Sequence, residues 1–139
     1  MTSIKYLVRL VFVCFFCAGF AQNSTIYSSE DVKYQSAIAL YNAQQYQSAQ
    51  VLFKSIESNA SEDLLKSNAA YYNANCAVRL NQPNAELLVE SFVAHYPSSI
   101  KRNSAFFEVA NYYFDNAKYA YARKWYDKVE VSSLSNSNL

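Results

Sequence analysis

Glycine is almost missing from this chain: Gly19 is the only one, and residues 22–139 contain none. Glycine-rich phosphate loops are thereby excluded from that region, because their backbone needs glycine. Strand-rich domains need glycine-bearing turns and alternating apolar residues, and neither is visible here. Apolar residues instead recur three and four positions apart, as at Phe106, Val109, Ala110 and Tyr113. This period predicts an all-α fold.

Cysteine and histidine are nearly as scarce, and this argues against a metal, redox or catalytic centre. Cys76 is the only cysteine after residue 21, so it cannot pair within that part of the chain and is expected to be a small buried side chain. His95, the only histidine, has no carboxylate at helical spacing to orient it. Glu86 and Glu90 share a helix face but lack metal-ligand companions. We therefore predict no catalytic residues, no cofactor, no metal and no enzymatic activity.

The chain also lacks any strong excess of charge. The whole sequence carries a formal net charge of +1, and its two most N-terminal basic residues, Lys5 and Arg9, lie in the leader described next. Without them, 10 basic side chains face 11 acidic ones. Nucleic-acid binding rests on clustered Lys and Arg that meet phosphates, so a nucleic-acid partner is not expected.

Residues 1–21 have the layout of a secretory signal peptide, expected to be helical. Lys5 and Arg9 precede an apolar run at 10–18, and the small residues of 19–21 suit cleavage before Gln22. The run is shorter than the roughly 20 apolar residues of a membrane-spanning helix, so an uncleaved anchor is the less favoured alternative. We expect an exported protein that meets the membrane only through this segment before cleavage.

Six helices are expected after the leader, at about 30–44, 47–58, 62–80, 84–95, 98–116 and 119–130. Residues 22–29 are polar and predict a flexible linker, and 132–139 predict a polar tail or a truncation point. Serines precede three of the helices and are candidate N-caps: Ser28 or Ser29, then Ser61, then Ser98 or Ser99.

A small-residue spacing recurs three times along the helices. Ala49, Ala85 and Ala122 lie 36 and 37 residues apart, and each is preceded by a small or polar residue at Ala37, Asn73 or Ala110. A period of this length is typical of stacked helix pairs. Alanine at these positions is expected where two helices approach most closely.

The pattern resembles the tetratricopeptide repeat, whose signature places aromatic, small and proline residues at fixed positions. The last repeat matches best, with Phe106, Val109, Ala110 and Tyr113 followed by Tyr119, Ala122 and Tyr126. The resemblance covers three repeats, at about 30–61, 62–97 and 98–131, with Lys33, Ser36 and Asn73 departing from the signature. It implies an α-solenoid of three antiparallel helix pairs.

The resemblance further implies that the first helix of each pair lines a concave groove that binds a protein or peptide. The candidate groove residues are aromatic, apolar and polar: Tyr34, Ile38, Tyr41, Asn42, Phe107, Asn111, Phe114 and Asp115. The middle repeat contributes Ala70, Ala74 and Ala77, which would leave room between two aromatic walls. Flat rings and amides suit an extended peptide. The alternative is that neighbouring repeats simply fill the groove.

The last helix pair is expected to leave an exposed end. Repeat arrays usually finish with a polar capping helix, and nothing after Glu130 could form one, so Trp125 and Val129 would face solvent or a partner. The end would then join further repeats, mediate self-association or dock another protein.

Two functional hypotheses follow. In the first, the chain is a non-enzymatic scaffold or adaptor of the cell envelope that binds its partner in the groove. Residues 94–99 and 119–129 are similar to repeats of bacterial envelope proteins, and the composition resembles that of secreted Bacteroidetes proteins. These resemblances imply a periplasmic or outer-membrane-associated location in a Gram-negative bacterium. In the second, the chain is the N-terminal structural part of a longer array that spaces or presents another domain.

Overall fold

A computed structural model describes residues 28–130 of the chain. This part is all-helical and contains no strand, as the periodicity predicted. Its helices are α2 (Ser29–Asn42), α3 (Tyr46–Asn59), α4 (Asp63–Arg79), α5 (Ala85–His95), α6 (Arg102–Asp115) and α7 (Tyr119–Tyr126). The predicted signal peptide, most of the predicted linker and the tail at 132–139 lie outside the described residues.

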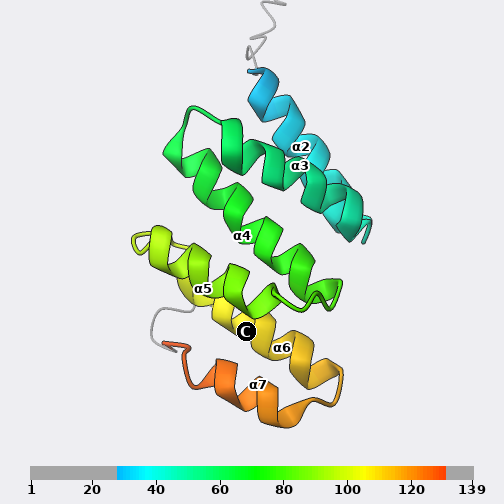
Figure 1. Cartoon of the computed structure of the whole chain (residues 1–139), viewed down its shortest axis with the longest axis vertical. Helices are drawn as coiled ribbons and strands as arrows, with labels where there is room; N and C mark the ends of the chain where they lie inside the picture. Colours follow the sequence, from blue (N-terminus) through cyan, green and yellow to red (C-terminus); the bar gives the residue numbers. More distant parts are fainter. Residues whose placement is uncertain (1–27, 131–139) are drawn as a thin grey trace, which may run out of the picture.

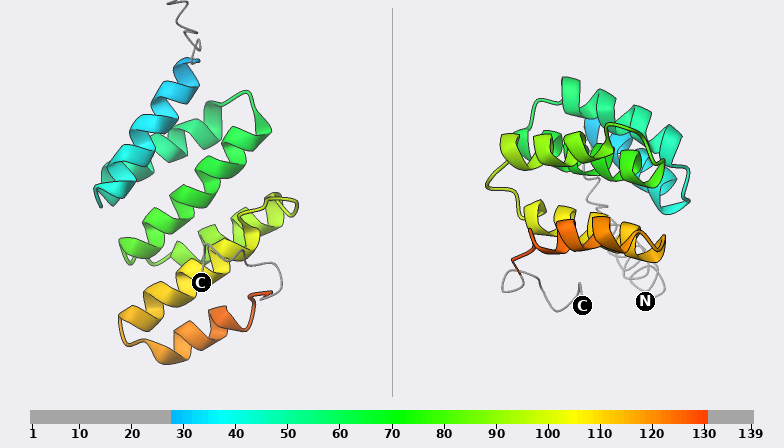
Figure 2. Two further views of the ribbon diagram at one scale, coloured as in Figure 1. Left: turned by 180° about the vertical axis from the view of Figure 1, so that it is seen from behind. Right: turned by 60° about the horizontal axis from the view of Figure 1, so that its bottom comes forward.

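The helices follow one another down the long axis of the molecule, and the chain reverses direction at each turn (Figure 1). α4 is the central element, since it contacts α3, α5 and α6 and most of its residues are buried. α6 and α7 pack against each other and lie together beside the group formed by α2 to α5 (second view of Figure 2).

The turns inside the helix pairs α2–α3, α4–α5 and α6–α7 share one geometry. Each contains a non-glycine residue in the left-handed region, Gln44 (φ 60°), Asn81 (φ 52°) or Ala117 (φ 57°). After α2, the N–H of Gln44 donates to the carbonyl of Tyr41 and the N–H of Gln45 to that of Leu40, and the other two turns repeat both bonds. This is the Schellman motif, which usually places glycine at the left-handed position. A chain almost without glycine therefore uses Gln, Asn and Ala at intervals of 37 and 36 residues.

The small residues of the repeated spacing are buried as expected. Ala37, Ala49 and Ala110 are fully enclosed, and Asn73, Ala85 and Ala122 are nearly so. The Asn73 side chain is held by Glu57 Oε2, to which its Nδ2 donates at 2.9 Å. This contact satisfies a polar group at a position where the other two pairs have alanine.

The predicted helix starts are partly correct. Ser28 caps α2 in a reciprocal capping box with Asp31, so the predicted linker ends before Ser28. Ser61 does not cap α4: its N–H and hydroxyl both donate to Glu30 Oε2, at 3.3 and 3.2 Å, and α4 begins without a side-chain cap. Ser99 accepts a bond from the N–H of Lys101, but α6 begins only at Arg102.

The end of the last helix differs most from the prediction. α7 stops at Tyr126 instead of continuing to 130. The side chain of Asn103, in the first turn of α6, donates to the Glu130 carbonyl at 2.8 Å and accepts from the Glu130 N–H at 2.7 Å. Asn103 therefore takes up the backbone groups that a longer helix would have used.

Candidate functional site

The eight predicted groove residues lie on α2 and α6, on either side of the central α4. Asn42, Phe114 and Asp115 are exposed, and the other five are half-buried. The surface that these helices share with α4 is called here the α2/α4/α6 face.

On the α2 side, the predicted aromatic residues pack against the hydrophobic core. Tyr34 packs edge-on against Phe53 and Tyr72, with ring centroids 6.0 and 6.3 Å apart. Tyr41 packs edge-on against Tyr72 at 5.1 Å, and Ile38 contacts the same cluster. Burial raises the pKa of both Tyr34 and Tyr41 to about 12, so their hydroxyls stay protonated at neutral pH.

An arginine that the sequence did not single out joins α2 to α4. Arg79 Nε donates to the Tyr41 hydroxyl at 3.4 Å, and its guanidinium carbon lies 5.6 Å from the centroid of the Tyr46 ring. Arg79 is exposed, so this cation covers an aromatic pair at the edge of the face. The sequence places Arg79 close to one repeat length after Tyr41, which is a spacing that could have indicated a contact. The repeat signature has no arginine at that position, so the contact was not predicted.

A second group missed by the sequence reasoning joins α4 to α6. The Tyr71 hydroxyl donates to Glu108 Oε1, and Lys101 Nζ lies 5.0 and 5.4 Å from the ring centroids of Tyr71 and Tyr72. Burial, followed by the charge of Glu108, raises the pKa of Tyr71. A carboxylate and an ammonium thus bracket the two tyrosines where α6 crosses α4.

On the α6 side, two predicted residues already have partners within the chain. Asn111 Oδ1 accepts a bond from the Tyr126 hydroxyl at 2.5 Å, and Phe107 packs edge-on against the Tyr126 ring at 6.1 Å. The amide oxygen that was expected to meet a peptide is therefore occupied. Phe114 contacts Tyr119 of α7 and remains 53 % exposed.

The expected space over the middle repeat does not exist. Ala70, Ala74 and Ala77 are all buried, in a core cluster that also contains Phe106, Val109 and Ala110 of α6. Small side chains on α4 allow α6 to approach closely, so the third helix pair fills the room that they would have left.

Trp125 is not exposed, so the prediction of a bare apolar end is wrong. The indole is fully buried, with its centroid 6.0 Å from that of Phe106, and Lys128 Nζ lies 4.4 Å from the centroid of the Trp125 ring. Val129 is half-buried and packs against the same cluster. Ala122 and Trp125 are the buried residues of α7 and form the side of the helix that faces the core. The exposed aromatic residues of α7 are Tyr119 and Tyr121 on its other sides.

Three pockets lined by residues within 28–130 lie away from the predicted groove residues. The largest of them, about 790 Å³, lies between α5 and α7 and is crossed by an ion pair between Lys124 and Glu86, with Nζ and Oε2 2.8 Å apart. A second, about 320 Å³, is lined by amides that include Gln50 and Gln82, whose side chains exchange two hydrogen bonds.

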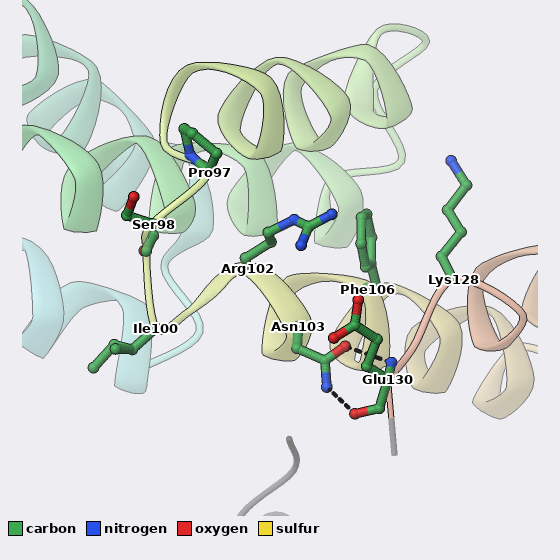
Figure 3. A pocket seen from close by; sticks show the side chains of 9 residues that line it. Pro97, Ser98, Ile100, Arg102, Asn103, Phe106, Lys128 and Glu130 are labelled. Atoms are coloured by element: carbon green, nitrogen blue, oxygen red, sulfur yellow. Dashed lines mark hydrogen bonds between the residues drawn. The ribbon is translucent and has the colours of Figure 1, made fainter. Parts of the chain in front are cut away.

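The third pocket, about 340 Å³, lies at the start of α6 (Figure 3). Pro97, Ser98 and Ile100 of the α5–α6 turn form one side, and Lys128 and Glu130 stand opposite. Asn103 lies at its base, and its side-chain amide forms two hydrogen bonds with the Glu130 backbone. The lysine is engaged as well, because its Nζ lies 2.9 Å from Glu90 Oε1. These contacts hold the chain after α7 against α6.

His95 and Cys76, the residues that the sequence analysis considered for chemistry, lie on different helices. His95 is exposed, with Nδ1 2.8 Å from the Ser91 carbonyl oxygen. Cys76 is fully buried, and burial raises the pKa of its thiol to about 12, far from the range of a reactive thiolate. Across residues 28–130, no cluster of His, Cys, Asp and Glu has the geometry to hold a metal ion. Within the same span, no helix has the length and apolar character needed to cross a bilayer.

Comparisons with known proteins do not assign a family. No protein-family model matches the chain, and neither a curated protein nor a solved structure matches it.

Proposed function

We propose that the chain is an exported, non-enzymatic interaction scaffold of the bacterial cell envelope. In this proposal it is built as a tetratricopeptide-like α-solenoid and binds a protein or peptide partner on the α2/α4/α6 face. Export rests on the leader-like pattern of residues 1–21, and the envelope location rests on the resemblance of the repeats.

The repeated turn geometry supports the solenoid. Left-handed residues at 44, 81 and 117 lie 37 and 36 residues apart, within one residue of the alanine spacing, and the turn of each helix pair contains the same two hydrogen bonds. Units that repeat in this way bury their apolar faces by stacking on neighbours. Stacked units present their first helices side by side, which is the arrangement that a partner would meet.

The exposure of Phe114 is the observation that carries the binding proposal. The aromatic residues at the α2 end of the face are packed or covered, whereas about half of the Phe114 side chain is open to solvent beside the exposed Asp115. Large aromatic side chains left at a surface are enriched where proteins meet partners.

Site-specific photo-crosslinking in the envelope of the source bacterium tests this function. A photoreactive residue would replace Asn42 at the end of α2 or Asn116 directly after α6, both of which are exposed. Val51 of α3 would serve as the exposed control position. We expect one protein to be captured from both Asn42 and Asn116 and not from Val51, with capture from Asn42 reduced by Phe114→Ser. Capture of the same proteins from all three positions, or of none, would count against the scaffold.

Export is tested separately by N-terminal sequencing of the protein recovered from the envelope fraction. Cleavage before Gln22 is expected. An intact N-terminus in a cytoplasmic fraction would exclude the exported role.

The second hypothesis, a structural part of a longer array, depended on a bare apolar end at Trp125. The Trp125 ring lies beside Phe106 and Lys128, so it gives this alternative no support, and the scaffold is the function that we put forward first.

A further inference from the structure

The aromatic pair Phe114–Tyr119 repeats the geometry of the pair Tyr41–Tyr46. Both pairs have ring centroids 5.4 Å apart, with interplanar angles of 66° and 69°. Each pair spans the same Schellman turn, around Ala117 or Gln44. The two pairs therefore occupy equivalent positions in the first and last helix pairs.

The chain itself covers the first of these pairs with a guanidinium. Arg79, the last residue of α4, lies over the Tyr46 ring and donates from Nε to the Tyr41 hydroxyl. α4 follows α3 in the chain and packs against it, so Arg79 belongs to the first helix after the Tyr41–Tyr46 pair. The equivalent positions in the middle helix pair, around Asn81, are Val78 and Pro83, which cannot form an aromatic pair.

The second pair is open. Phe114 is 53 % and Tyr119 61 % exposed, and no cation within residues 28–130 lies over either ring. The adjacent Lys118 is directed elsewhere, with Nζ 5.7 Å from the Tyr113 centroid and 3.2 Å from Asn81 Oδ1. The residue after Tyr41 is the neutral Asn42, whereas the residue after Phe114 is Asp115. The open pair therefore has an acidic neighbour that the covered pair lacks.

We propose that Phe114, Tyr119 and Asp115 form a binding site for an arginine at the end of a helix in a partner protein. This proposal rests on the proposed function and names the chemistry of its partner. Arginine suits the site better than lysine because its planar guanidinium stacks on an aromatic ring and pairs with a carboxylate. Phe114 lacks the hydroxyl of Tyr41, so the Tyr119 ring and the Asp115 carboxylate hold the guanidinium.

A partner protein fits this site better than a second copy of the chain. Arg102 begins a helix, whereas Arg79 ends one. Arg123 is near the end of α7, but the apolar stripe of that helix is already buried in its own core. Neither Arg102 nor Arg123 can therefore reach the site from the end of a helix as Arg79 reaches Tyr46.

An NMR titration of the full chain tests the site, with N-acetyl-arginine amide as the probe and N-acetyl-lysine amide as its comparison. We expect arginine to shift the ring resonances of Phe114 and Tyr119 saturably, with lysine weaker by about two- to tenfold. Tyr119→Ala should abolish the shift at Phe114. Tyr121→Ala is the matched control, because Tyr121 is 55 % exposed on the same helix.

The Arg79→Ala variant supplies an internal control. Removing this exposed side chain uncovers Tyr41 and Tyr46, so the arginine probe should then shift Tyr46 as well. A probe that shifts Tyr46 in this variant but never Tyr119 would overturn the proposal. Equal shifts by lysine, equal losses in Tyr121→Ala, or no shift at either pair would overturn it too.

The crosslinking experiment separates this proposal from the function beneath it. Undiminished capture of one partner from Asn42 and Asn116 in the Tyr119→Ala chain would support the scaffold and exclude the arginine site. Failure of capture from both positions would exclude the scaffold function. The NMR titration would still show whether the arginine site exists. Self-association in analytical ultracentrifugation that Tyr119→Ala abolishes would assign the site to a second copy and overturn the partner.

Discussion

Asn103 holds the backbone of Glu130 by both of its amide atoms, donating to the carbonyl at 2.8 Å and accepting from the N–H at 2.7 Å. One side chain at the start of α6 thus completes the end of the last helix pair. An amide side chain of α6 thus supplies both the donor and the acceptor that the Glu130 backbone needs after α7 has ended.

We predict that Asn103→Ala destabilises the protein by about 1 kcal/mol, because two exposed hydrogen bonds are lost together. Asn103→Asp keeps the acceptor and loses the donor, so it should fall between Asn103→Ala and the parent. Urea denaturation measures the change, and hydrogen exchange at the Glu130 amide should accelerate in Asn103→Ala. An unchanged exchange rate would show that Asn103 does not hold this segment.

The left-handed turn positions predict stabilising substitutions. Gln44→Gly and Ala117→Gly should each raise the free energy of unfolding by about 0.5–1 kcal/mol, because a Cβ in this conformation costs roughly 1–2 kcal/mol and glycine's added chain entropy offsets part of the gain. Asn81→Gly should change little, since asparagine tolerates the left-handed region.

Ala39→Gly is the control for the turn variants. Ala39 is exposed within α2, so glycine there should destabilise by about 1 kcal/mol. Thermal unfolding compares the four variants. Destabilisation by both Gln44→Gly and Ala117→Gly would mean that these residues do not hold a left-handed conformation in solution.

Burial of Trp125 predicts a large cost for its removal. Trp125→Ala should destabilise by about 3–5 kcal/mol, the usual range for deleting a buried large aromatic side chain. Tyr121→Ala, at an exposed position of the same helix, should change stability by about 0.5 kcal/mol or less. As the only tryptophan of the chain, Trp125 should also resist acrylamide quenching until the protein unfolds. Strong quenching in the native state would mean that Trp125 is exposed to solvent and would contradict its burial.

Glu86 predicts a loss of stability in acid. Burial acts to raise the pKa of its carboxyl, but the hydrogen bond and charge of Lys124 outweigh burial and lower it. A folded pKa below the unfolded value, about 4.3, means that the stabilisation is present above that value and is lost as the pH falls through the folded pKa.

Glu86→Gln should therefore cost up to about 1 kcal/mol at pH 7, as expected for a partly exposed ion pair, and much less at pH 3. Glu90→Gln should have a smaller effect, because the Glu90 side chain is 46 % exposed against 28 % for Glu86. Urea titrations at pH 3 and pH 7 measure both differences. A cost for Glu86→Gln that is the same at the two pH values would contradict the ion pair.

Much of the local structure follows from short-range patterns in the chain. The apolar period predicted the all-helical fold, and the positions of Gln45, Pro83 and Ala117 located the turns within the helix pairs. Ala49, Ala85 and Ala122 were expected at close helix contacts and are buried. These features depend on residues a few positions apart, so a single sequence carries enough information to predict them.

The site was only partly predictable, because it depends on how distant helices meet. The choice of α2 and α6 for the face came from a family resemblance, but the capture of Asn111 by Tyr126 and of Tyr41 by Arg79 did not follow from it. Both contacts join side chains on different helices. Their partners are set by the crossing of those helices and by side-chain rotamers, neither of which a periodic pattern specifies.

Trp125 marks the boundary between the two kinds of information. Its helical stripe with Ala122 showed that it belongs to an apolar face, and the amino-acid sequence carries that much. Whether the face meets solvent or Phe106 depends on where α7 lies relative to α6 and α5. That placement arises from long-range packing of the helix pairs and from the Lys124–Glu86 and Lys128–Glu90 contacts, so it exists only in the folded molecule.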